Sequence, residues 1–231
     1  MSLILVGVVH KDPDGHVRLS GLLESLQPQA ITVELSPVGL LWREAKGQGL
    51  LGAFEFMARR LSLADHYGHL ELVSEGLKIP FEFTASLAYS ERHGAPLHLL
   101  DLNWVSLRNL PLYESEVLTE ENLMLLREVP SDPVRVVVKR AYLRAARCLA
   151  EVPGRWEKET TSWEEATGRQ RERLLACRLR RLAGRYGRVI HVGGWVHLIK
   201  GNEGLSLASL LRDLNPSRIL LEGGHGPLAL P

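Results

Sequence analysis

The sequence has few cysteines and no long apolar run, and both absences limit the class of protein it can encode. Cys148 and Cys177 are the two cysteines among 231 residues, so there is no disulfide framework and a reducing compartment fits best. No segment approaches the roughly 18–20 apolar residues that span a bilayer. The first residues also lack the basic and apolar regions of a secretory signal. We therefore expect a cytoplasmic protein with no membrane partner.

The chain also lacks a strong excess of positive or negative charge. The chain has 28 basic and 27 acidic residues, a net charge of +1, so no nucleic-acid partner is expected. There is no phosphate-binding loop, dinucleotide fingerprint or Gly-x-Ser-x-Gly motif, which argues against nucleotide chemistry and ordinary serine hydrolases. The expected partner is a small-molecule or peptide substrate. The sequence is compatible with a homodimer but does not specify one.

What the sequence does contain is a strand–helix–strand pattern at its start. "LILVGVV" is typical of a strand buried on both faces, and "AITVEL" of a second one. Between them, Leu19, Leu22, Leu23 and Leu26 have helical spacing. Such a unit predicts parallel strands joined by a right-handed connection. Further strands are expected at "APLHLLDLN", "RVIHVGG" and "SRILLEGG".

The middle of the chain is helical in pattern, with glycine breaks between 39 and 79 and a nearly continuous helical stretch further on. Ser162 is expected to cap a helix that begins before Glu164 and Glu165. We predict one α/β domain over residues 1–231. Its core is formed by 1–108 and 186–231, and a helical insertion covers about 109–185.

An internal repeat links the two ends of the chain. Leu19–Glu34 and Leu207–Glu222 align without a gap, with seven identities in sixteen positions. Each copy follows a strand that leads into Gly-x-x-His, once at Gly7–His10 and once at Gly194–His197. The repeat predicts a mostly parallel central sheet built from two pseudo-symmetric βαβ halves.

The repeat also predicts where polar side chains meet. Ligands of parallel α/β sheets gather at the carboxyl ends of strands, and pseudo-twofold packing would bring His10 and His197 together with Glu34 and Glu222 nearby. Two histidines and a carboxylate can bind a divalent metal with open positions. The competing interpretation is that each polar residue merely caps a buried strand.

Other histidines complete the set of candidates. His225 in "EGGHG" is expected at the same sheet edge, and His191 is interpreted as a hydrogen-bonded core histidine. His66 and His69 are three residues apart, but no third ligand accompanies them, so a metal site is not expected there.

In the order of these motifs the chain resembles the TraB/PrgY–TIKI–GumN family, whose superfamily includes erythromycin esterases and ChaN-like proteins. The landmarks are "LILVGVVH", "AITVELSP", "HLLDLNWVSLR", "RQRERLLACRL" and "VIHVGGWVHLIKG". The resemblance implies a parallel-sheet core and a metal-dependent hydrolase of peptide, amide or ester bonds. It implies catalytic roles for His10, Glu34, His197 and Arg171. Asp101 joins the two histidines and Glu34 as a ligand or supporting residue of a divalent Mn, Co or Zn ion.

The sequence leaves two alternatives open, one for the mechanism and one for the function. A bound ion could activate water, or a histidine or Glu34 could act directly as general base. The family generally has small residues inside each motif, whereas Val8, Val9, Trp195 and Val196 stand here, and we expect them either to narrow the pocket or to block access to backbone donors. The alternative function is therefore a non-catalytic protein that binds a peptide signal or a haem-like ligand in the same crevice. A third is a structural or regulatory protein that keeps the fold without the site.

Overall fold

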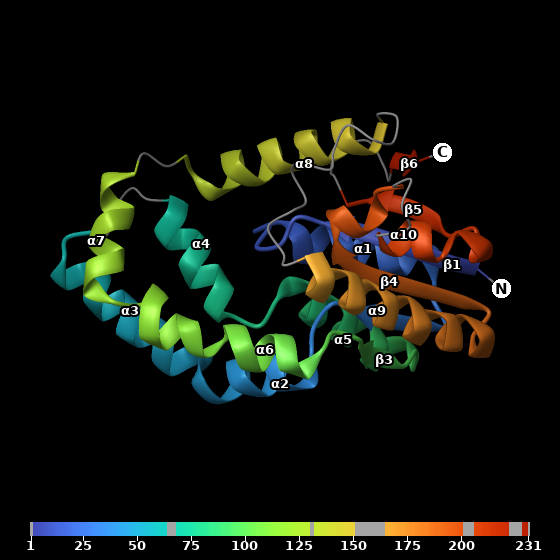
Figure 1. The fold of residues 1–231 in the computed structure, drawn as a ribbon, viewed down its shortest axis with the longest axis horizontal. Helices are drawn as coiled ribbons and strands as arrows, with labels where there is room; N and C mark the ends of the chain where they lie inside the picture. Colours follow the sequence, from blue (N-terminus) through green and yellow to red (C-terminus); the bar gives the residue numbers. More distant parts are fainter. Residues whose placement is uncertain are drawn as a thin grey trace.

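The protein is built around a six-stranded sheet with the order β3-β2-β4-β1-β5-β6 (Figure 1). The computed structural model describes residues 2–63, 68–129, 132–150, 165–200, 206–221 and 228–230. The strands are β1 (Ser2–Val8), β2 (Ala30–Val33), β3 (Leu97–Leu99), β4 (Arg188–Gly194), β5 (Ser217–Leu220) and β6 (Leu228–Leu230). Strands β1 to β5 run parallel, and β6 is antiparallel to β5. The predicted α/β class with a mostly parallel sheet is confirmed.

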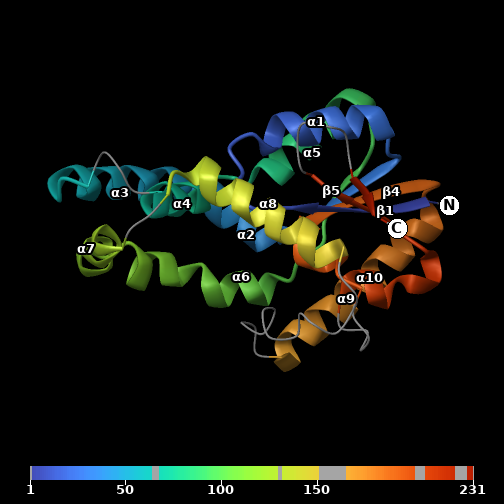
Figure 2. The same ribbon diagram turned by 90° about the horizontal axis from the view of Figure 1, so that it is seen from above.

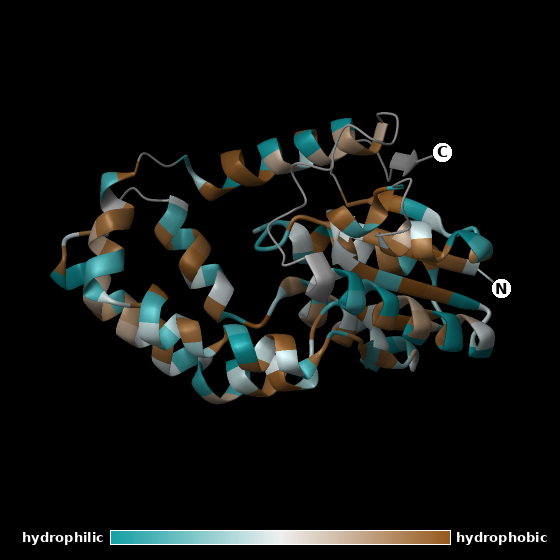
Figure 3. Ribbon diagram, in the orientation of Figure 1, coloured by the Kyte–Doolittle hydropathy of each residue, from teal (hydrophilic) through white to brown (hydrophobic). Residues whose placement is uncertain are grey.

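Helices cover both faces of this sheet, which explains why its central strands are uninterrupted apolar runs. Helices α1 (Gly15–Leu26) and α5 (Phe81–His93) lie on one face (Figure 2). Helices α9 (Glu165–Arg185) and α10 (Leu207–Leu210) lie on the other. The hydropathy colouring accordingly runs brown along the strands and alternates on the helices (Figure 3). Among the described residues, no helix combines the length and apolarity needed to cross a bilayer.

The local structure of the two repeat copies is alike. Helix α1 buries Leu19, Leu22 and Leu23 and ends at Gln27, whose φ of 46° is left-handed. In the second copy, α10 and the 3₁₀ turn η4 (Arg212–Leu214) end at Asn215, with a φ of 45°. This left-handed conformation, which asparagine tolerates better than most residues, stops the helix, and the proline that follows in each copy prevents its continuation. Each copy then enters a strand, β2 or β5.

The two halves interleave in the sheet. Strand β4 lies between β1 and β2, whereas β1 lies between β4 and β5. The first strand of the second unit, β4, therefore lies between the two strands of the first unit, and the first strand of the first unit, β1, lies between the two strands of the second. The pairing of β1 with β4 is in register from Ser2↔Arg188 to Val8↔Gly194, so both strands end at the same level. This register brings the two Gly-x-x-His segments to one edge.

A helical arm stands beyond the carboxyl ends of the strands (Figure 1). Its elements are α2 (Pro37–Trp42), the π-helical turn η1 (Arg43–Gly47), α3 (Gln48–Arg60), α4 (Gly68–Leu77), α6 (Asn103–Asn109), the π-helical turn η2 (Tyr113–Val117) and α7 (Glu120–Glu128). The arm has its own apolar core, made of Phe54, Leu63, Leu70, Leu77, Leu118 and Leu123. Helix α8 (Val134–Ala150) leads back to the sheet, where its Val138 and Tyr142 join the main core.

Three details differ from the sequence-based expectation. Residues 37–77 belong to the helical arm, whereas α8 and α9 pack into the main core, so the arm does not coincide with 109–185. Gly47 does not break its helix: a Cβ there would lie 2.7 Å from the Leu77 carbonyl oxygen, so this glycine permits close packing. Strand β6 was not expected, because "LAL" is too short to show a period. The expected cap at Ser162 lies outside the described residues.

Candidate functional site

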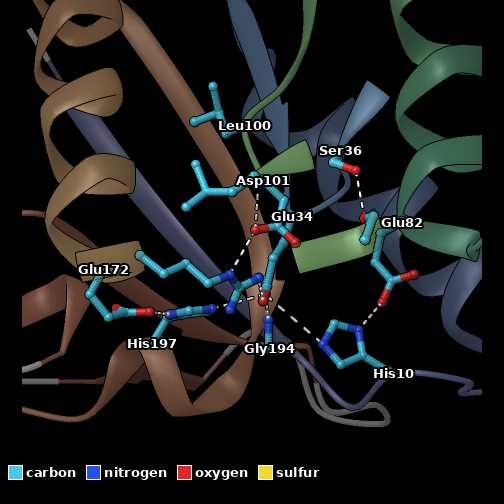
Figure 4. Close-up of polar contacts among 12 residues, drawn as sticks. His10, Glu34, Ser36, Glu82, Leu100, Asp101, Glu172, Gly194 and His197 are labelled. Atoms are coloured by element: carbon cyan, nitrogen blue, oxygen red, sulfur yellow. Dashed lines mark hydrogen bonds and ion pairs between the residues drawn. The ribbon is translucent and has the colours of Figure 1, made fainter. Parts of the chain in front are cut away.

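The polar residues of the motifs gather at the carboxyl edge of the sheet (Figure 4). His10 follows β1, Glu34 follows β2 directly, Asp101 follows β3, and His197 lies in the 3₁₀ turn η3 (Trp195–Leu198) after β4. They share this edge because the strands are parallel and neighbouring. Helix α9 adds Arg171 from one face of the sheet.

Glu34 is the centre of the site. Its Oε1 accepts a hydrogen bond from Arg171 Nη2 at 2.6 Å, and its Oε2 accepts one from the Gly194 N–H at 2.7 Å. Burial favours the neutral acid, but the charges of His197, Arg171 and His10 together outweigh it and hold the pKa of Glu34 well below its usual range. The carboxylate is therefore ionised at neutral pH.

His197 lies between two carboxylates. Its Nε2 is 2.9 Å from Glu34 Oε2, an ion pair without hydrogen-bond alignment, and its Nδ1 is 2.9 Å from Glu172 Oε1. Burial lowers the pKa of this imidazole, but the charges of Glu34 and Glu172 outweigh burial and raise it to about 10. His197 is thus an imidazolium at neutral pH.

Arg171 connects Glu34 to Asp101. Besides the bond to Glu34, its Nε donates to Asp101 Oδ1 at 2.7 Å, and the same oxygen accepts the Leu102 N–H at 2.8 Å. The guanidinium is 8% exposed. Glu172, His197, Glu34, Arg171 and Asp101 therefore form a buried chain of alternating charges. In the described contacts Asp101 joins this chain through Arg171 and not through an imidazole.

His10 is the accessible member of the site, with a side chain that is 52% exposed. Its Nδ1 is 2.6 Å from Oε1 of the buried Glu82, at the start of α5, while its Nε2 is 3.9 Å from Glu34 Oε2. Desolvation lowers the pKa of His10, but the hydrogen bond and charge of Glu82 and the charge of Glu34 outweigh it, so the pKa is raised above 6.5. The Glu82 contact favours a neutral tautomer with the proton on Nδ1 and a lone pair on Nε2.

The backbone after His10 is held in an unusual conformation. Lys11 has a φ of 65°, which non-glycine residues rarely adopt, and such strain persists only when its surroundings fix it. The next residue, Asp12, is buried and receives hydrogen bonds from Arg18 Nη2 at 3.0 Å and from the Tyr142 hydroxyl at 3.1 Å. Helices α1 and α8 thereby fix the loop that carries His10.

Glycines let the backbone of β4 come close to these side chains. A Cβ at Gly193 would lie 2.8 Å from Glu34 Oε2 and 3.0 Å from His191 Nε2. His191 is buried; its Nδ1 is 2.8 Å from the Thr32 hydroxyl, but its Nε2 has no hydrogen-bond partner in the described residues. Burial, then the charge of His197, lower the pKa of His191 to about 3, so it is neutral. His191 is therefore a core histidine with a hydrogen-bond partner at Nδ1 and none at Nε2 among the described residues.

The donor types fit a divalent metal, although the described part of the chain contains no preformed ligand group. Among the described residues, no three His, Cys, Asp or Glu side chains are arranged to hold an ion. The Nε2 atoms of His10 and His197 nevertheless face the same Glu34 oxygen. Each Nδ1 is held by a glutamate, as is usual behind metal-binding imidazoles. His197 would have to lose a proton before it could ligate.

Sequence reasoning missed two carboxylates, Glu82 and Glu172. An acidic residue in the first turn of a helix is normally explained by the helix dipole, so Glu82 gave no signal. Glu172 lies inside the charged run "RQRERL" beside Arg171. His66, Glu222 and His225 lie outside the described residues, and His69 is on α4, away from these contacts.

The bulky motif residues differ in how far they are buried. Val8 is 0% exposed and belongs to the main core, and Trp195 packs partly buried against that core. Val196, in contrast, is 41% exposed. Val8 therefore packs within the core, whereas Val196 is accessible to solvent.

Comparison with known proteins adds no identification. No model of a protein family matches the chain, and no solved structure matches it either.

Proposed function

We propose that the protein hydrolyses an ester or amide bond of a small molecule or peptide, with His10 as general base. One observation carries this proposal: a half-exposed imidazole whose Nδ1 is held by Glu82 at 2.6 Å and whose Nε2 has no donor or acceptor at hydrogen-bond distance among the described residues. This is the arrangement that general-base catalysis requires.

The proton transfers can be written for the chain's own residues. Neutral His10 accepts a proton at Nε2 from the water that adds to the carbonyl carbon. It then returns that proton to the leaving oxygen or nitrogen as the old bond breaks. Glu82 accepts the Nδ1–H hydrogen bond and, with the ionised Glu34 at 3.9 Å, stabilises the imidazolium that forms in between.

The remaining residues keep Glu34 in place and ionised. Arg171 and the Gly194 N–H bind its two oxygens, and the His197 imidazolium lies beside one of them. If a divalent Mn, Co or Zn ion binds, His10, Glu34 and His197 are the residues that would hold it, and it would supply Lewis-acid activation of the water. Asp101 would then support the site through Arg171.

A hydrolysis screen tests this proposal. A panel of esters and peptides is assayed with the wild type and His10→Gln, each in the presence of a chelator and after loading with Mn, Co or Zn. Removal of the base is expected to lower kcat/KM by about 10²-fold or more. His93→Gln is the matched control, because His93 also pairs with a carboxylate, Glu24, but on the surface.

The outcomes separate the candidate functions. Hydrolysis that is lost in His10→Gln and kept in His93→Gln supports the proposal, and its dependence on the chelator decides whether a metal takes part. No hydrolysis by the wild type under any condition contradicts it. That result would favour the non-catalytic binding protein.

A further inference from the structure

A second polar group lies next to His10, outside the charge chain around Glu34. Lys11 follows His10 directly, and its left-handed backbone turns the chain at this point. A Cβ on Gly76 of α4 would lie 3.3 Å from Lys11 Nζ and 2.9 Å from the Tyr113 hydroxyl. The ammonium and the hydroxyl therefore meet at a glycine of the helical arm.

Arg43 adds a second cation to this group. Its Nη1 donates to the Gly39 carbonyl at 3.1 Å, but its Nε is buried and has no hydrogen-bond partner in the described part of the chain. Gly47, whose added Cβ would lie 3.9 Å from Arg43 Cβ, packs against the carbonyl of Leu77, the residue after Gly76, so Arg43 and Lys11 approach the same turn of α4. Desolvation is the main reason that the pKa of Lys11 is lowered; the charge of Arg43 lowers it further, and the charge of Glu75 opposes both effects. Desolvation likewise lowers the pKa of Arg43, whereas Tyr113 and Glu82 act in the opposite direction and raise it.

The two carboxylates that act on these cations already have partners. Glu75, whose charge raises the pKa of Lys11, pairs with Lys78 at 2.5 Å, and Glu82, whose charge raises the pKa of Arg43, binds His10. Glu82 Oε1 binds His10, and its Oε2 is buried without a partner in the described residues, so it does not satisfy Arg43 Nε. Buried polar atoms are normally satisfied, and here a donor and an acceptor both remain to be paired. In the described residues neither Lys11 nor Arg43 forms an ion pair within 4.0 Å.

We propose that Lys11 and Arg43, with the Tyr113 hydroxyl, form a binding site for an oxyanion, a carboxylate or phosphate group on the molecule that reaches His10. A guanidinium and an ammonium supply the donors that such groups prefer, in a partly desolvated setting where charged hydrogen bonds are strong. The assignment of this group to the substrate rests on the proposed function, which it deepens by making the substrate anionic. Binding itself does not depend on hydrolysis.

Isothermal titration with succinate and, separately, with inorganic phosphate tests the site. The wild type is expected to bind at least one of the two, which also shows whether carboxylate or phosphate is preferred. Lys11→Met is expected to weaken binding by about 10-fold or more, since a charged hydrogen bond is lost. Lys11→Arg should retain binding, which shows that a loss in Lys11→Met is not a folding defect. The control is Lys46→Met, because Lys46 lies near Arg43 but is exposed and pairs with Glu114.

Other outcomes of these titrations would contradict either the anion site or the hydrolase proposal. If the wild type binds neither anion, or Lys11→Met and Lys46→Met bind equally well, the unpaired atoms are satisfied by solvent and the proposed site is wrong. The titration is repeated with His10→Gln, in which anion binding should persist. Anion binding that depends on Lys11 in a protein without hydrolytic activity would overturn the hydrolase proposal alone.

Discussion

His10 and His197 occupy matching positions in the repeat, yet their surroundings give them different ionisation states. His197 is 6% exposed and lies between two carboxylates, so it carries a proton at neutral pH. His10 is 52% exposed and contacts one carboxylate closely, Glu82, which raises its pKa while its Nε2 remains accessible. A repeated sequence has thus produced one histidine suited to hold Glu34 and one suited to exchange protons with a substrate.

The smallest residue of the site provides a direct test of its packing. Gly193→Ala would place a Cβ 2.8 Å from Glu34 Oε2, between that carboxylate and His191. We expect it to lower the free energy of unfolding by ~1–3 kcal/mol, because overpacking forces neighbouring groups to shift. Denaturant titration measures this change. Gly21→Ala on α1 is the control: no atom lies within 4 Å of its Cβ, so equal destabilisation of both variants would contradict the packing described.

At the scale of elements, helix α8 fixes the loop that carries His10. The Tyr142 hydroxyl donates to the buried Asp12, two residues after His10, while Arg135 near the start of α8 pairs with the exposed Asp14. The first contact is buried and the second lies on the surface. They should therefore differ in their contribution to stability.

Tyr142→Phe separates these contacts. Loss of the buried hydrogen bond should cost ~1–3 kcal/mol of unfolding free energy, because Asp12 loses a partner where water does not replace it. Arg135→Gln should change stability by ~0.5 kcal/mol or less, since exposed ion pairs are screened. Chemical denaturation compares the two. Similar effects of both variants would show that α8 does not fix the loop through Asp12.

Much of the element arrangement was predictable from the sequence because it depends on local patterns. The apolar runs predicted β1, β2 and β4, and the repeat with its Gly-x-x-His segments predicted that residues after these strands meet. The partners Glu82 and Glu172 were not predictable, since each comes from a helix whose surface charges have ordinary local explanations. The extent of the helical arm was not predictable from the sequence, because its core joins residues 54–77 to 118–123, a contact that no local pattern reveals.

At the scale of the whole molecule, the ionisable core predicts how stability depends on pH. The pKa of His197 is raised to about 10, so its contribution is fully present below pH 6.5 and is lost as the pH rises towards 10. The pKa of His191 is lowered to about 3, so stability falls as the pH drops from 6.5 towards 3, where the unfolded chain binds a proton and the folded one does not. Glu34, with its lowered pKa, adds to the loss as the pH falls through 4.5.

Stability should therefore be greatest near neutral pH. Urea unfolding across a pH series measures this profile. His197→Gln should flatten its alkaline side and leave the acid-side loss from His191 in place. A profile that rises steadily from pH 6.5 to 10 in the wild type would contradict the buried imidazolium.

The central claim is that Glu82 orients and tunes His10 as the base of a hydrolytic site. The measurement that tests it most directly is the pH dependence of kcat/KM for wild type and Glu82→Gln. Because the neutral imidazole is the active form, the rate should rise with pH through a pKa above 6.5 in the wild type. In Glu82→Gln this rise should move to lower pH, because the charge that raises the pKa of His10 is gone, and the plateau should fall by about 10-fold as the orientation is lost. An unchanged profile, or no hydrolysis by the wild type, would contradict the account.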